Sequence, residues 1–112
     1  MKTEVRQDNE VTTVSVHENV DALTASDLAK VIVDQIAQGH VNIVVDLVHV
    51  EFMSSAGLRT LLGAVKETRS QGGDLRIVST NPGIDKVLKM SGFYNIAKLY
   101  TSPADAVASF NA

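Results

Sequence analysis

The 112-residue chain contains no cysteine, and this absence excludes several kinds of chemistry. Without thiols there is no disulfide bond, no thiolate zinc site and no cysteine nucleophile. An excess of positive charge is also missing, because 10 Lys and Arg residues against 13 Asp and Glu residues leave a formal net charge of -3. A chain of this charge does not favour binding to nucleic acid or to an anionic membrane.

Long apolar runs are absent as well. The N-terminal stretch MKTEVRQDNEV is polar and carries no apolar core of a signal peptide. No stretch approaches the roughly 18 apolar residues that a membrane span needs. Neither phosphate-binding loop motif, G-x-x-x-x-G-K-[ST] or G-x-G-x-x-G, occurs, so we predict no cofactor. We therefore expect a cytoplasmic protein that does not enter the membrane.

What the sequence does contain is an alternation of strand and helix patterns. Residues 11–16 (VTTVSV) are typical of a strand, and residues 3–7 predict a short edge strand joined to it by a hairpin turn. Residues 41–50 (VNIVVDLVHV) are almost continuously apolar, which indicates a central strand buried on both faces of a parallel sheet. Further strands are predicted at residues 74–80 and 96–100.

Apolar residues at helical spacing predict about four helices between these strands. The first has capping-box spacing between Thr24 and Asp27 and ends at Gly39, and the second begins at Ser54 or Ser55. Two more begin at residues 81–82 and 102–103, each with a Pro in the first turn. The composition, 45% hydrophobic and 21% charged, suits one globular domain over residues 1–112. The fold prediction is a single α/β domain with a mixed four- to five-stranded sheet.

Signatures of catalysis or of a metal site are weak. The three histidines lie far apart in the sequence: His17, His40 and His49. Asp46 follows the central strand, where a carboxylate can be catalytic, but we prefer the interpretation that it accepts backbone hydrogen bonds in a turn. Ser55 does not fit the nucleophile motif G-x-S-x-G, because Met53 occupies the first glycine position. We predict no catalytic residue and no metal ligand.

The stretch HVEFMSSAGLRTLL (residues 49–62) places two serines and two small residues where a strand gives way to a helix. One serine is expected to cap the helix, but a cap alone does not explain Gly57, since alanine is favoured there by about 0.5–1 kcal/mol. Small residues would leave the first turn open to another molecule. A phosphate there would be tolerated by the helix N-terminus, yet would add about -1.5 to -2 charges to a lean surface. The pattern is that of a docking surface that phosphorylation can switch off.

Three stretches together resemble the anti-sigma factor antagonists, whose fold is the STAS domain. They are ENVDALTA (18–25), IVVDLVHVEFMSSAGLRTLL (43–62) and GGDLRIVSTNPGIDKVLKMSGFYNI (72–96). The first is similar to the family's Gly-Glu-Leu-Asp-Ala turn, and the second to its central Phe-Met/Ile-Asp-Ser-Ser/Ala-Gly-Leu signature. With the N-terminal strands, the resemblance covers nearly the whole chain.

This resemblance implies a bacterial, non-enzymatic regulator that acts by partner switching. The unphosphorylated protein would bind an anti-sigma factor that is also a serine kinase, and so free the sigma factor. Phosphorylation would weaken that complex until a phosphatase resets it. Aligned on Phe52, Gly57 and Leu58, the phosphoacceptor is Ser55. The implied partner-binding residues are Asp21, Ser54, Ser55, Ala56, Gly57 and Arg59.

Two positions depart from the family pattern. Ser54 stands where an aspartate is common, so it is an alternative phosphoacceptor or a plain helix cap. His17 replaces the glycine of the Gly-Glu-Leu-Asp turn. A second reading is a STAS binding module that is not phosphorylated and serves another signalling or lipid-transport complex. A third is a small enzyme built on Asp46, Asp21 and Ser55. We expect the free protein to be a monomer, because nothing in the sequence indicates an obligate dimer.

Overall fold

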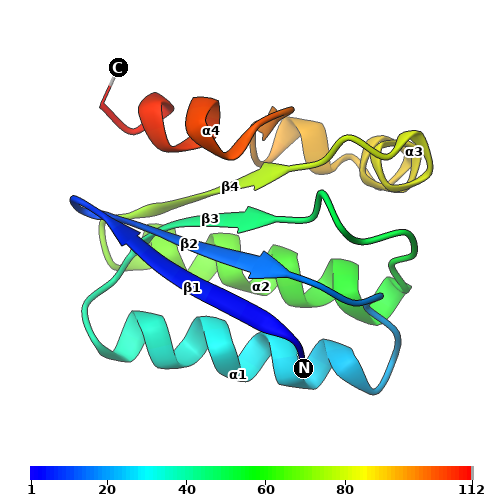
Figure 1. Cartoon of the computed structure of the whole chain (residues 1–112), viewed down its shortest axis with the longest axis horizontal. Helices are drawn as coiled ribbons and strands as arrows, with labels where there is room; N and C mark the ends of the chain where they lie inside the picture. Colours follow the sequence, from blue (N-terminus) through cyan, green and yellow to red (C-terminus); the bar gives the residue numbers. More distant parts are fainter. Residues whose placement is uncertain (112) are drawn as a thin grey trace.

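The computed structural model describes residues 1–111, apart from the side chain of Tyr94. Over this range five strands form one mixed sheet in the order β1-β2-β3-β4-β5 (Figure 1). The strands are β1 (Thr3–Asp8), β2 (Val11–Val16), β3 (Asn42–Asp46), β4 (Asp74–Val78) and β5 (Leu99–Tyr100). The predicted fold class, a single α/β domain with a mixed sheet, is confirmed.

Strand direction places the functional edge of the sheet. β1 and β2 form an antiparallel hairpin whose turn holds Asn9 at a φ of 57°. From β2 to β5 all neighbouring strands are parallel, with Val14 opposite Val45 and Val45 opposite Ile77. The carboxyl ends of β2, β3 and β4 therefore meet at one edge of the sheet, on the right in Figure 1. In parallel α/β sheets this edge is where binding sites are usually built.

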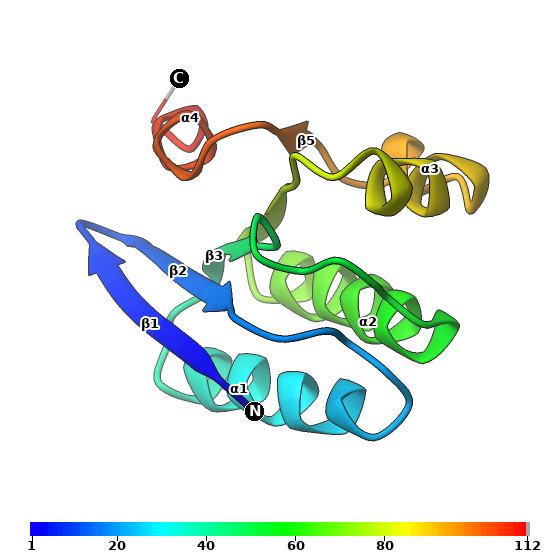
Figure 2. The ribbon, with the colours of Figure 1, turned by 45° about the vertical axis from the view of Figure 1, so that its right-hand side comes forward.

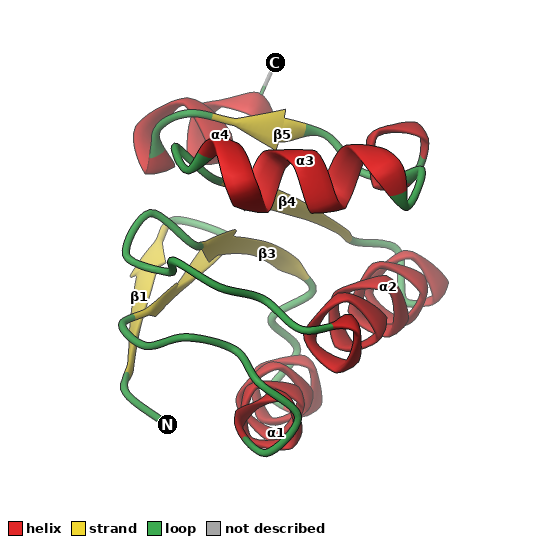
Figure 3. Cartoon of the chain, turned by 90° about the vertical axis from the view of Figure 1, so that its right-hand side faces the viewer, coloured by secondary structure: helices red, strands yellow, loops and turns green. Residues whose placement is uncertain are grey.

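Four α-helices connect the strands or cover the sheet. They are α1 (Thr24–Ala37), α2 (Ser55–Ser70), α3 (Pro82–Met90) and α4 (Pro103–Ser109), with a short 3-10 turn, η1, at Phe93–Asn95. Figure 3 shows α1 and α2 together on one side of the sheet, and α4 on the other. The predicted cap at Asn81 is observed, because its Oδ1 accepts from the amides of Gly83 and Ile84.

The main core lies between the sheet and helices α1 and α2. Its buried side chains include Val14, Val45 and Ile77 from the strands and Leu28 and Leu61 from the helices. On the opposite face, Val11, Val44, Val78 and Ala106 form a smaller cluster under α4. Strand β3 thus has buried side chains on both faces, as its continuous apolar run predicted.

The prediction of a strand over residues 41–50 is wrong at its C-terminal end, because β3 stops at Asp46. The carboxylate of Asp46 accepts from the amide of Val48, and the Val50 amide donates to the carbonyl of Leu47, so the chain turns. Leu47 and Val50 are nevertheless fully buried. Their hydrophobicity reflects packing of the loop into the core and not membership of the strand.

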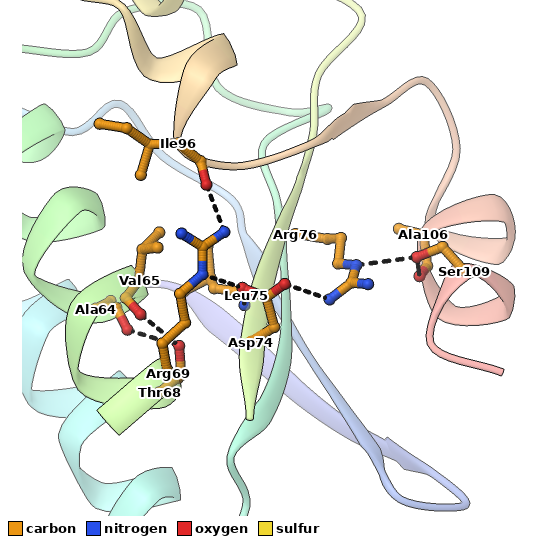
Figure 4. A network of polar contacts seen from close by, with 10 residues as sticks. All are labelled: Ala64, Val65, Thr68, Arg69, Asp74, Leu75, Arg76, Ile96, Ala106 and Ser109. Atoms are coloured by element: carbon orange, nitrogen blue, oxygen red, sulfur yellow. Dashed lines mark hydrogen bonds and ion pairs between the residues drawn. The ribbon is translucent and has the colours of Figure 1, made fainter. Parts of the chain in front are cut away.

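Asp74 ties the C-terminal end of α2 to the rest of the fold (Figure 4). One carboxylate oxygen accepts from Nε of Arg69 at 2.9 Å, and the other accepts from a guanidinium nitrogen of Arg76 at 2.8 Å. Arg69 also donates to the carbonyl of Ile96, and Arg76 to the hydroxyl of Ser109. This network joins β4 to both the η1 turn and α4.

Within the described residues, no helix has the length and apolar character that crossing a membrane requires.

Two glycines of α2 predict opposite effects of substitution by alanine. A Cβ on Gly57 would lie 2.7 Å from Cγ1 of the buried Val20, whereas a Cβ on Gly63 would meet nothing within 4 Å. We expect Gly57→Ala to destabilise the fold by about 1 kcal/mol, because the overpacking cost of about 1–3 kcal/mol exceeds the gain in helix propensity. Gly63→Ala should stabilise it by about 0.5–1 kcal/mol. Urea unfolding at low protein concentration measures both, and equal shifts for the two variants would contradict this account.

Candidate functional site

Two loops at the carboxyl edge of the sheet are joined by backbone hydrogen bonds. Residues 17–23 follow β2 and residues 47–54 follow β3, and Figure 2 shows the two segments running side by side. The amide of Val20 donates to the carbonyl of Phe52 at 3.0 Å, and the amide of Ser54 donates to the carbonyl of Val20 at 2.7 Å. This short parallel bridge sets the point where α2 begins.

The side chain of Asn19 strengthens the same junction. Its Oδ1 accepts from the backbone amides of Glu51 at 2.9 Å and of Phe52 at 3.0 Å. One exposed side chain thus satisfies two amides that lie more than 30 positions away in the chain. No local pattern marks Asn19 as important, and the sequence analysis missed it.

A pair of histidines also meets across the two loops. The rings of His17 and His49 stack with centroids 4.8 Å apart and an angle of 23° between their planes. Nε2 of His17 lies 3.5 Å from a carboxylate oxygen of Glu4. The distance between the two histidines in the sequence hid this contact. Among the described residues, no group of three or more His, Asp or Glu side chains is placed to hold a metal ion.

Asp21 caps helix α1. Its Oδ1 accepts from the amides of Leu23 and Thr24 at 2.9 and 2.8 Å, and the hydroxyl of Thr24 in return accepts from the Asp21 amide at 2.9 Å. The predicted capping box, with Thr24 first and Asp27 second, is therefore wrong. Thr24 is instead the second residue of a capping box that begins at Asp21. Hydrogen bonds from the backbone and the hydroxyl of Thr24 lower the pKa of Asp21 from its ordinary value.

The two adjacent serines have different surroundings. Ser54 is half-buried and caps α2, because its hydroxyl oxygen accepts from the amide of Gly57 at 3.2 Å. Ser55, the first residue of the helix, is exposed. Over the part of the chain that the structure describes, its hydroxyl makes no hydrogen bond, and the amides of Ser55 and Ala56 have no partner. The first turn of α2 contains no acidic residue.

Gly57 does not provide open space for another molecule, and that expectation is wrong. The residue is buried and faces Val20 and Met53, whose side-chain atoms lie 2.7 and 3.0 Å from the position of an added Cβ. The missing side chain allows α2 to approach the joined loops closely. Ala56 is half-buried and packs against the main core.

The two joined loops carry two unusually exposed apolar side chains. Leu23 is 82% exposed and Phe52 is 53% exposed. Arg59, one helical turn after Ser55, is exposed as well. Leu23, Phe52, Ser55 and Arg59 are together called the Ser55 surface below. Phe52 entered the sequence analysis only as an alignment position, and the exposure of Leu23 became visible only from the fold.

Asp46 has the turn-forming role that we preferred. It is 6% exposed, and its two carboxylate oxygens accept from the hydroxyl of Ser15 at 3.2 Å and from the amide of Val48 at 3.1 Å. In the described chain neither Asp46 nor Asp21 hydrogen-bonds to Ser55. The carboxylates of Asp46 and Asp21 are instead engaged in a turn and a helix cap, so the hydrogen bonds of the described residues do not support the polar trio of the enzyme hypothesis.

The STAS domain model matches residues 2–106. The chain belongs to the STAS domain family. A sequence relative, the anti-sigma F factor antagonist of Paenibacillus polymyxa, is 31% identical over 84 residues, which span 73% of this chain and 72% of the relative. The resemblance seen in the sequence is thus confirmed.

Solved structures of STAS proteins share the whole fold. An anti-sigma factor antagonist from Mycobacterium paratuberculosis superposes with a TM-score of 0.91 at 27% identity, over 99% of this chain and 94% of that one. Bacillus SpoIIAA in its phosphorylated form gives a TM-score of 0.75 at 19% identity, over 97% of this chain and 99% of that one. SpoIIAA in its unphosphorylated form gives a TM-score of 0.77 at 17% identity, over 99% of both chains.

Asn19→Ala tests whether one side chain holds the two loops together. The change removes the acceptor of two backbone amides, and we expect a loss of about 1–2 kcal/mol in the free energy of unfolding. Hydrogen exchange at the amides of Glu51 and Phe52 should become faster. Asn19→Asp retains an acceptor oxygen and should protect both amides. Unchanged exchange in the alanine variant would show that the side chain does not hold the junction.

The lowered pKa of Asp21 predicts a pH-dependent cap. Because the folded-state pKa of Asp21 lies below its ordinary value of 3.8, the stabilisation by the charged carboxylate is present above pH 3.8 and is lost as pH falls through the folded pKa. Asp21→Asn should therefore have a lower urea midpoint than the wild type at about pH 7, and the difference should be smaller at about pH 2, well below the ordinary pKa of 3.8. A difference of the same size at both pH values would argue against a charge-dependent cap.

Proposed function

We propose that this STAS domain is an anti-sigma factor antagonist that acts by partner switching. Its unphosphorylated form binds an anti-sigma factor serine kinase, phosphorylation of Ser55 by that kinase releases it, and a phosphatase resets it. The name of the Paenibacillus relative and the existence of SpoIIAA in an unphosphorylated and a phosphorylated form support the proposal. The proposal adds to these relatives the assignment of Ser55 as the phosphorylated residue of this chain.

The observation that carries the proposal is the difference between the two serines. The hydroxyl of Ser54 is engaged as the α2 cap, and its residue is held by the backbone bond to Val20. Ser55 presents an exposed hydroxyl, with no hydrogen bond from the described residues, to whatever docks on this edge. A kinase needs such an accessible hydroxyl, so Ser55 and not Ser54 is the acceptor. The departure at position 54 thus replaces the common aspartate by another good helix cap.

We assign docking of the anti-sigma factor kinase to the two apolar residues of the Ser55 surface, Leu23 and Phe52. Leu23 and Phe52 belong to the two hydrogen-bonded loops, and more than half of the surface of each residue is exposed. Full burial of an exposed leucine or phenylalanine contributes up to about 1.5–3 kcal/mol to association, so these two residues are the expected apolar anchors of a larger contact. Arg59 adds a charge that favours correct orientation and faster association.

Phosphorylation of Ser55 would weaken partner binding without unfolding helix α2. The free amides of Ser55 and Ala56 and the positive end of the helix dipole favour an anion, and Arg59 lies one turn along the same face. A partner that covers Leu23 and Phe52 would meet about two negative charges beside its apolar contact. The domain therefore stays folded while the complex dissociates.

A STAS binding module without phosphorylation remains the alternative, because the exposure of Leu23 and Phe52 supports docking in either case. The two functions differ only in whether the hydroxyl of Ser55 is used. Phosphopeptide mapping by mass spectrometry of the protein from its own host separates them. Phosphate on Ser55 supports the switch, and its absence under all growth conditions favours the plain module.

Substitution of Ser55 tests the switch directly. Ser55→Asp should abolish detectable binding to the anti-sigma factor kinase of the same host, since an unpaired charge at an interface costs about 2–5 kcal/mol. Ser55→Ala should bind with nearly wild-type affinity and accept no phosphate. Calorimetric titration measures the binding, and incubation with the kinase and ATP measures the phosphorylation.

Ser54→Ala is the matched control. It should lose about 1 kcal/mol of stability with the helix cap, yet still be phosphorylated on Ser55. Undiminished binding by Ser55→Asp, or phosphate on Ser54 alone, would contradict the assignment of Ser55.

A further inference from the structure

An apolar groove lies between helices α1 and α2 on their outer surface. Along α2 it runs from Arg59, which also belongs to the Ser55 surface, toward the C-terminal end of the helix. The groove has a volume of about 260 Å³. The residues that line it are Ala29, Ile32, Val33, Ile36, Arg59, Thr60, Gly63, Ala64 and Glu67. Val33 is 58% exposed although it is apolar. Only two lining residues are charged, one of each sign.

Gly63 lies in the middle of α2 and has no role in packing within the chain. A Cβ at this position would meet no atom within 4 Å, in contrast to Gly57 in the first turn. Glycine in a helix interior is less favourable than alanine, and here no close internal contact or turn explains it. The free space at Gly63 does allow the backbone of another helix to approach closely, as small residues do at helix–helix contacts.

The two charged residues of the groove are placed symmetrically about Gly63. Arg59 precedes it by four residues and Glu67 follows it by four, so all three lie on one face of α2. Eight residues of helix separate the two charges by about 12 Å, which prevents them from pairing with each other. In the described chain Arg59 has no ion pair, and the carboxylate of Glu67 accepts only from the side-chain Nε2 of Gln71, at 2.8 Å.

We propose that this face binds a second copy of the chain, with two α2 helices crossing antiparallel at Gly63. A two-fold axis through the crossing point places Arg59 of each copy opposite Glu67 of the other. The surface is therefore complementary to itself in charge, which an isologous dimer requires. The same contact covers Val33 and the apolar floor of the groove. The proposed interface shares Arg59 with the Ser55 surface but does not require phosphorylation of Ser55. It departs from the sequence-based expectation of a monomer.

Analytical ultracentrifugation over a range of protein concentrations tests the dimer. The wild type should shift from the 12.0 kDa chain mass to twice that mass as concentration rises. Arg59→Glu alone and Glu67→Arg alone each place like charges opposite one another, and each should weaken the dimer at least about tenfold. The double variant Arg59→Glu/Glu67→Arg restores both pairs and should dimerise like the wild type.

An equimolar mixture of the two single variants provides a stricter test. Each homodimer is repulsive, but a heterodimer contains two attractive pairs, so mixing should restore dimerisation. Gly63→Gln should also prevent the close approach of the helices while leaving the urea midpoint of the dilute protein no lower than that of the wild type.

Two results would overturn the proposal. One is a wild type that stays monomeric up to about 1 mM, where even weak specific association is detected. The other is a dimer that the charge reversals and Gly63→Gln leave unchanged, because its interface would then lie on another surface.

Discussion

The backbone bridge between Val20 and the segment Phe52–Ser54 is the contact on which the functional edge depends. It holds Ser54 at the N-cap position of α2. The next residue, Ser55, is therefore the first residue of the helix, and it is exposed. It also brings Val20 so close to the first helical turn that Gly57 has no room for a side chain. Two loops that each lack regular structure thereby become a rigid platform, since a β-type pairing satisfies their polar groups.

Sequence patterns predicted what depends on neighbours along the chain. The alternation of strands and helices, the turn at Asp46 and the serine cap of α2 all follow from local periodicity and capping chemistry. Contacts between distant segments were not predictable in this way, and the amides that Asn19 holds lie more than 30 residues away. The prediction of the capping residues of α1 was wrong for a different reason. Asp21 and Thr24 are both good capping residues, and the pattern of residue types alone did not show that Asp21 accepts the first amides of the helix.

Helix α2 shows that one residue type serves two physical purposes. Gly57 is required by the interior, because a buried valine occupies the space of its side chain, whereas Gly63 faces solvent and leaves its space empty. Small residues in the first turn were expected to make room for an external partner, which is incorrect for Gly57. Of these two glycines, only Gly63 leaves space that is open to another molecule. Helix propensity is equal at both positions in principle, so only the surroundings distinguish them.

The common direction of β2, β3 and β4 divides the domain into two unlike edges. The Ser55 surface occupies the carboxyl edge, while the turns that follow β1, α1 and α2 lie at the opposite edge (Figure 1). These turns contain Asn9, Gly39 and Gly72, each with a positive φ. Those turns are exposed and lie at the far end of the molecule from Ser55. An added segment or a fluorescent label there would leave the carboxyl edge sterically free. The architecture thus places exposed turns at one end of the parallel strands and the Ser55 surface, where we propose that a partner docks, at the other end.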